Sequence, residues 1–136
     1  MKQVLFILLF FSFINADYGQ APSVNKNDDE RKVYFKAQVE PSFPGGESAW
    51  QNFVESNLDT NIPVKNGATT GTYSVTISFI VNIDGSLTNI VCENNAGYGM
   101  CQEAIRVIKK SKKWKPATEN GRIVNAFHRE TIVFRI

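Results

Sequence analysis

Residues 72–83 alternate between apolar and polar side chains, and this alternation constrains the fold more than any other part of the sequence. Every second residue is apolar and lies on one face: Tyr73, Val75, Ile77, Phe79, Val81 and Ile83. Such a period of two over twelve residues predicts a half-buried β-strand. Asp84-Gly85 follows at once, and residues 87–92 resume a β-type composition. Because glycine accepts a positive φ without steric cost, the two runs predict a β-hairpin.

Two helices flank this hairpin in the sequence. Residues 46–58 carry one apolar stripe: Ala49, Trp50, Phe53, Val54 and Leu58. A second stripe runs from Met100 to about Lys112, with lysines gathered at its end, where they oppose the negative end of the helix dipole. Pro116 prevents that helix from continuing.

The remaining segments complete an α+β pattern. Residues 33–39 have the composition of an extended segment, and Asn120-Gly121 marks a turn before a long strand at 123–136. Ile132, Phe134 and Ile136 fall on the expected buried side of that strand. The predicted fold is therefore two helices packed on one face of a three-stranded antiparallel sheet.

The first sixteen residues have the pattern of a signal peptide. Lys2 precedes the apolar run from Val4 to Ile14, which is too short for an ordinary membrane span of roughly 20 residues. We expect residues 1–16 to be removed on export, 17–40 to form a flexible lead-in with an extended segment, and 41–136 to form one domain. The alternative is that the apolar run stays uncleaved as a membrane anchor.

The chain contains two cysteines, Cys92 and Cys101. An even count in an exported protein predicts a disulfide, which across so short a loop stabilises by about 2.5–3 kcal/mol in the chain-entropy treatment. A metal or redox pair is the weaker interpretation, because the spacing is not Cys-x-x-Cys and the chain has one histidine.

We expect thiol titration of the denatured protein to find no free thiol, because both cysteines are consumed by the disulfide. Titration after reduction provides the control and should release both thiols. Two free thiols before reduction would contradict the pairing.

No catalytic constellation is visible in the sequence. It lacks the metalloprotease, nucleophile-elbow and phosphate-loop motifs, and its acidic residues are scattered. We therefore predict that the protein is not an enzyme and needs no cofactor or metal. His128 is interpreted as a solvent-facing strand residue.

Charge is distributed unevenly along the chain, although the formal net charge is only +2. Basic residues concentrate after residue 100, above all in the run Lys109–Lys115. A net charge near zero argues against nucleic-acid binding. We interpret this run as a solvated helix end, with Trp114 turned into the core.

The edges of a three-stranded sheet expose unpaired backbone groups. A partner peptide can pair there as an added strand, and a second copy of the chain can pair there to form a homodimer. Arg129, Glu130 and Arg135 fit either a protected edge or a polar binding edge. The sequence leaves these alternatives open.

Several motifs, in this order and spacing, resemble the TonB C-terminal domain family of Gram-negative bacteria. Phe43-Pro44-Gly45-Gly46 resembles the entry to that domain, and the strand before Asp84-Gly85 resembles its central hairpin. Trp114-Lys115-Pro116-Ala117 resembles its W-x-P-A segment, and Phe134 its closing apolar position. The resemblance covers about residues 41–136.

The resemblance implies a periplasmic or secreted protein that binds an extended, TonB-box-like peptide of an outer-membrane transporter by β-augmentation, within TonB-dependent transmembrane transport. Carried onto this chain, the binding surface is the last strand, with these residues: Val124, Ala126, His128, Glu130, Ile132 and Phe134. An uncleaved N-terminus would instead make the chain a short, inner-membrane-anchored energy transducer. A secreted structural or inhibitor domain without a transporter partner is the third alternative.

Two features depart from the family. Members that transmit energy keep a membrane anchor and a long proline-rich linker, whereas residues 17–40 here contain one internal proline, Pro22. Glu130 and Thr131 stand where the family often has a proline before the last apolar strand residues.

Overall fold

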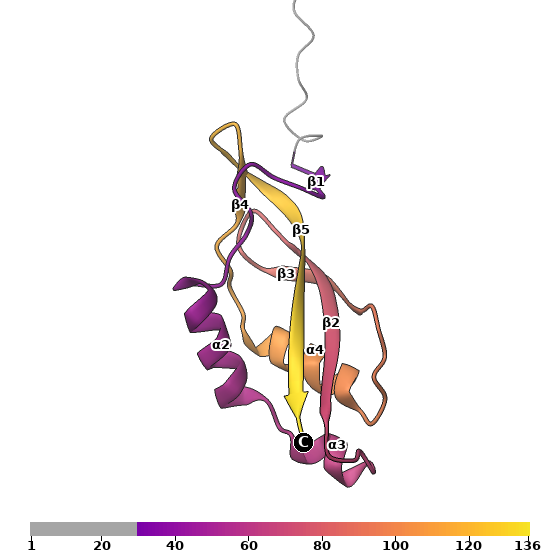
Figure 1. Ribbon diagram of the computed structural model, residues 1–136. Helices are drawn as coiled ribbons and strands as arrows, with labels where there is room; N and C mark the ends of the chain where they lie inside the picture. The colour runs from indigo at the N-terminus through magenta and orange to yellow at the C-terminus, as the bar shows by residue number, and fades with distance from the viewer. Residues whose placement is uncertain (1–29) are drawn as a thin grey trace, which may run out of the picture.

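The computed structural model describes residues 30–136, and the predicted signal peptide and residues 17–29 of the lead-in lie outside this range. The elements in chain order are β1 (Val33–Tyr34), α2 (Gly46–Asn57), α3 (Asn61–Lys65), β2 (Thr72–Val81), β3 (Leu87–Cys92), α4 (Met100–Lys110), β4 (Ala117–Glu119) and β5 (Arg122–Arg135). Figure 1 shows α2 and β2 on opposite sides of the long strand β5.

The sheet is built around β5. Its strand order is β1-β5-β2-β3, and β4 also pairs with β5. β2 and β3 form the predicted antiparallel hairpin, and β2 pairs with β5 from Thr72–Arg135 to Val81–Ala126. The α+β class is confirmed.

The prediction of a strictly three-stranded antiparallel sheet is wrong. The sheet is mixed and has five strands, because β1 adds in parallel beside Asn125 and Ala126. β4 adds a short hairpin, which turns at Asn120-Gly121, where both residues have positive φ. Strands of two and three residues carry too few side chains for a periodic pattern to reveal them.

The two long helices were predicted, and α3 was not. α2 and α4 begin at the predicted residues, and α4 has Lys109 and Lys110 in its last turn. α3 is only five residues long and follows α2 after a short link. One helical turn around a buried Pro63 leaves no apolar stripe in the sequence.

The core lies between the sheet and the helices. The predicted face of β2 is fully buried from Val75 to Val81, whereas Ile83 is 41% exposed because β2 has already ended. The placement of Ile83 on the buried face was therefore wrong. Trp114 is 3% exposed and packs edge-on against Trp50, as its predicted core position requires.

The disulfide between Cys92 and Cys101 is present and joins the end of β3 to the first turn of α4. Between the two cysteines, the side-chain amide of Asn94 makes hydrogen bonds to β2 of the kind that a neighbouring strand would make. Its Oδ1 accepts a hydrogen bond from the Thr76 N–H, and its Nδ2 donates to the Ser74 carbonyl at 3.0 Å. The cross-linked loop thus extends the ladder beside β2 beyond the end of β3.

The Asp84-Gly85 turn is held against the backbone of Trp114. The Trp114 N–H donates to the Gly85 carbonyl at 2.8 Å. Hydrogen bonds from the Ser86 hydroxyl and N–H lower the pKa of Asp84. Gly85 has φ +81°, and a Cβ added there would lie 2.4 Å from the Trp114 carbonyl oxygen. Only glycine fits both the backbone conformation and the contact.

We expect Gly85→Ala to lower the free energy of unfolding by about 3 kcal/mol or more, combining left-handed strain with overpacking. Gly67→Ala is the matched control, because Gly67 has φ +91° but open space around it. That variant should lose only about 1–2 kcal/mol. Chemical denaturation of both variants measures the difference, and equal losses would contradict a role for the Trp114 contact.

Candidate functional site

The sheet has two outer edges, and they differ in regularity. The β3 edge is interrupted, because its pairing with β2 shifts register between Ser78 and Ile80 and Asn89 has φ +51°. Such a bulge disrupts the alignment of backbone groups. The β5 edge carries β1 only beside Asn125 and Ala126. From Phe127 to Arg135, no strand within residues 30–136 pairs with it on the side away from β2.

The direction of the backbone groups on this edge follows from the ladder. Gly71 and Ile136 exchange both backbone hydrogen bonds, at 3.0 and 3.2 Å. Bonded and non-bonded pairs alternate along an antiparallel ladder. Even-numbered residues from Ala126 to Phe134 therefore bond with β2. The N–H and C=O groups of odd-numbered residues 127–135 point toward the unpaired side.

The six residues predicted for the binding edge have their side chains toward the interior rather than along the edge. Val124 and Ala126 are buried in a small cluster with Ala37 and Ala117. Ile132 and Phe134 belong to the main core. These even-numbered residues lie on the same strand as the unpaired edge. The unpaired backbone groups themselves belong to their odd-numbered neighbours.

His128 is not solvent-facing, contrary to the prediction. Its ring lies against Phe79 and Trp114, with ring centroids 5.5 and 5.3 Å apart, because even-numbered residues of β5 face the helices. Its Nε2 lies 2.8 Å from Glu130 Oε1. The side chains of His128 and Glu130 are 20% and 17% exposed, at the boundary between core and surface.

A groove of about 290 Å³ lies between the unpaired half of β5 and one face of α2. The helix and its C-cap residue Leu58 contribute two rows of side chains with a spacing of four residues: Glu47, Gln51 and Glu55 in one row, and Trp50, Val54 and Leu58 in the other. The strand contributes Glu130 to Val133 and Arg135. An unpaired strand edge and a partly apolar groove therefore lie side by side.

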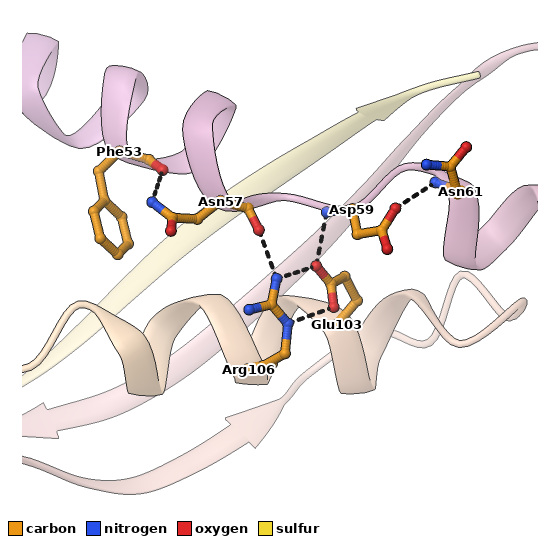
Figure 2. A network of polar contacts seen from close by, with 6 residues as sticks. All are labelled: Phe53, Asn57, Asp59, Asn61, Glu103 and Arg106. Atoms are coloured by element: carbon orange, nitrogen blue, oxygen red, sulfur yellow. Dashed lines mark hydrogen bonds and ion pairs between the residues drawn. The ribbon is translucent and has the colours of Figure 1, made fainter.

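The position of α2 is fixed at its C-terminal end by Glu103 of α4, whose side chain is 1% exposed (Figure 2). Arg106 binds both carboxylate oxygens, at 2.6 and 2.8 Å, and this hydrogen bonding raises the pKa of Arg106. The same carboxylate accepts the Asp59 N–H at 2.8 Å, and Arg106 also donates to the Asn57 carbonyl. The end of α2 and the link to α3 are thus tied to α4.

The N-terminal half of α2 is fixed by aromatic packing. Phe43 contacts Trp50, Phe53 and Trp114, with ring centroids 5.2–5.7 Å apart. The Trp114 indole donates to the Ser111 hydroxyl at 2.8 Å, so its polar atom is satisfied inside the core. Because both ends of α2 are held, the width of the groove is set by the fold.

The contribution of α2 to the groove was not predicted from the sequence, although a pattern in the sequence indicates it. Glu47, Gln51 and Glu55 form a regular polar row directly beside the apolar one, which places a charged border along a helix. The odd-numbered edge residues were missed because their role depends on the hydrogen-bond register with β2, which composition does not encode.

Residues 30–136 contain no group of three or more His, Cys, Asp or Glu side chains placed to hold a metal ion. Over the same range, no helix has both the length and the apolar character needed to cross a membrane.

We expect Glu103→Ala to lower the free energy of unfolding by about 2–3 kcal/mol, because it leaves the Asp59 N–H and the Arg106 guanidinium without their partner. Gln102→Ala, an exposed position on the same turn, is the control and should change stability by less than about 0.5 kcal/mol. Urea denaturation followed by tryptophan fluorescence measures both. Equal stability of the two variants would show that Glu103 does not hold α2.

The family described as Gram-negative bacterial TonB protein C-terminal matches residues 68–136, which is half of the chain and includes β2, β3, α4, β4 and β5. No curated protein and no solved structure matches the chain.

Proposed function

The chain belongs to the TonB C-terminal family, and we propose that it is a periplasmic protein that binds an extended peptide of an outer-membrane transporter. In this proposal the peptide adds to β5 as a new strand. The protein thereby takes part in TonB-dependent transport across the outer membrane. Family membership supports the class of partner, and the geometry of β5 supports the mode of binding.

One observation carries the proposal: the unpaired edge of β5 from Phe127 to Arg135 lies next to a groove. In β-augmentation, backbone hydrogen bonds supply affinity, and pockets for alternate side chains supply specificity. The odd-numbered backbone groups offer the first contribution. The groove below α2 offers the second.

The groove suits side chains of an extended peptide. Trp50 and Ile132 form a buried apolar floor, 3% and 1% exposed, with the half-buried Val54 and Leu58 beside them. In an added strand every second side chain points to the same face. Alternate apolar residues of the peptide would therefore bury their surface against α2, while its other residues face solvent.

Thr131→Pro tests this mode of binding. Proline removes the Thr131 N–H, which points to the unpaired side, and leaves the β2 ladder intact because that ladder uses the even-numbered residues. We expect a TonB-box peptide to bind about tenfold more weakly, since one backbone bond is lost and the ring obstructs the added strand. Nuclear magnetic resonance titration measures the affinity and locates the shifted amides.

Thr131→Val is the matched control, because it keeps the N–H and removes only the hydroxyl group that lies 3.2 Å from that of Thr76. This variant should bind the peptide as the unchanged protein does. Amide shifts confined to residues outside 127–135, or equal affinity of Thr131→Pro and Thr131→Val, would contradict β5 as the binding edge.

A further inference from the structure

We infer that the peptide bound along β5 carries a basic side chain, lysine or arginine, at a position that faces Glu47 and Glu130. This inference rests on the proposed function and specifies the chemistry of the partner. It follows from the charges that line the groove and from their distribution along it.

The groove is acidic along most of its length. Its lining contains three carboxylates, Glu47, Glu55 and Glu130, and one cationic side chain, Arg135. Arg135 is five residues beyond Glu130 on the strand, about 16 Å away at the usual rise per residue. The excess negative charge at the Glu130 end is therefore poorly compensated by Arg135.

Glu47 and Glu130 converge on one hollow. Both line a space of about 90 Å³, together with Pro41, Phe43, Trp50 and His128. Glu47 bonds to the neutral Gln51 amide at 3.0 Å, and Glu130 bonds to His128. Neither contact supplies the permanent positive charge that a lysine or arginine would bring.

The apolar floor between the helix and the strand lets these carboxylates distinguish a basic peptide side chain from an acidic one. A cation held beside Trp50 and Phe43 is partly removed from water, so its attraction to a carboxylate exceeds that of a fully exposed pair. An acidic peptide side chain at the same position would be repelled by both carboxylates. Selection thus combines attraction of one charge with rejection of the other.

Three peptides test the inference on the purified protein. Each is a fluorescein-labelled sequence of alternating threonine and valine, flanked by serines, in which one central valine is replaced by lysine, glutamine or glutamate. We expect the lysine peptide to bind about fivefold more tightly than the glutamine peptide, and the glutamate peptide to bind most weakly. Fluorescence anisotropy measures the affinity of each peptide. The preference for the lysine peptide should become smaller in about 0.5 M NaCl, because salt screens the charges.

Matched variants locate the preference. Glu47→Gln and Glu130→Gln should each reduce it, and Glu47→Lys should reverse it in favour of the glutamate peptide. Glu119→Gln is the control, because it changes the net charge equally on β4, outside the groove lining. It should keep the fivefold preference, and an equal loss in this variant would show that overall charge, rather than the groove, decides.

The outcomes separate the two proposals. If all three peptides bind equally and shift the amides of residues 127–135, basic selection is wrong and the proposed function stands. If no peptide shifts these amides, the proposed function is also wrong. If the same amides shift with protein concentration in the absence of peptide, a second copy occupies the edge, and both proposals are overturned.

Discussion

Glu103 ties together the parts of the molecule on which the candidate site depends. Its carboxylate is the only charged group among the buried polar side chains of residues 30–136. A buried charge is stable only when its partners are complete. Arg106 and the Asp59 N–H meet that condition, and in doing so they hold the end of α2 against α4. α2 in turn forms the wall of the groove beside β5, so a contact inside the domain sets the geometry of its surface.

The candidate site also depends on the sheet, which provides a strand that is held by β2 on one side and unpaired on the other. β5 lies in register with β2 over ten consecutive residue pairs. The buried face that includes Phe134 anchors it to the core. The proposed addition of a partner strand would therefore need no reorganisation of β5, which would lower the entropic cost of binding. The bulged edge of β3 lacks this regularity.

Much of this fold could be predicted from local patterns. The alternation in residues 72–83, the Asp84-Gly85 turn and the two apolar helix stripes led to the correct class, and the even cysteine count led to the disulfide. β1 and β4 could not be predicted, because they are too short to show a period. The site was harder for a different reason. Which backbone groups of β5 are unpaired depends on a register between residues that lie from 45 (Val81–Ala126) to 63 (Thr72–Arg135) positions apart in the chain. His128, by contrast, shares the face of Ile132 and Phe134, so its inward side chain follows from the two-residue period of the strand.

β1 gives the unpaired edge a fixed starting point. It lies against Asn125 and Ala126, and the chain then leaves the sheet at Phe35, whose ring is 5.6 Å from that of Phe127. In the proposed complex, an added strand could not extend past this point, because β1 already pairs with the backbone there. The two-residue strand would then limit where pairing with a foreign chain begins. It would thereby determine which residues of that chain lie next to α2.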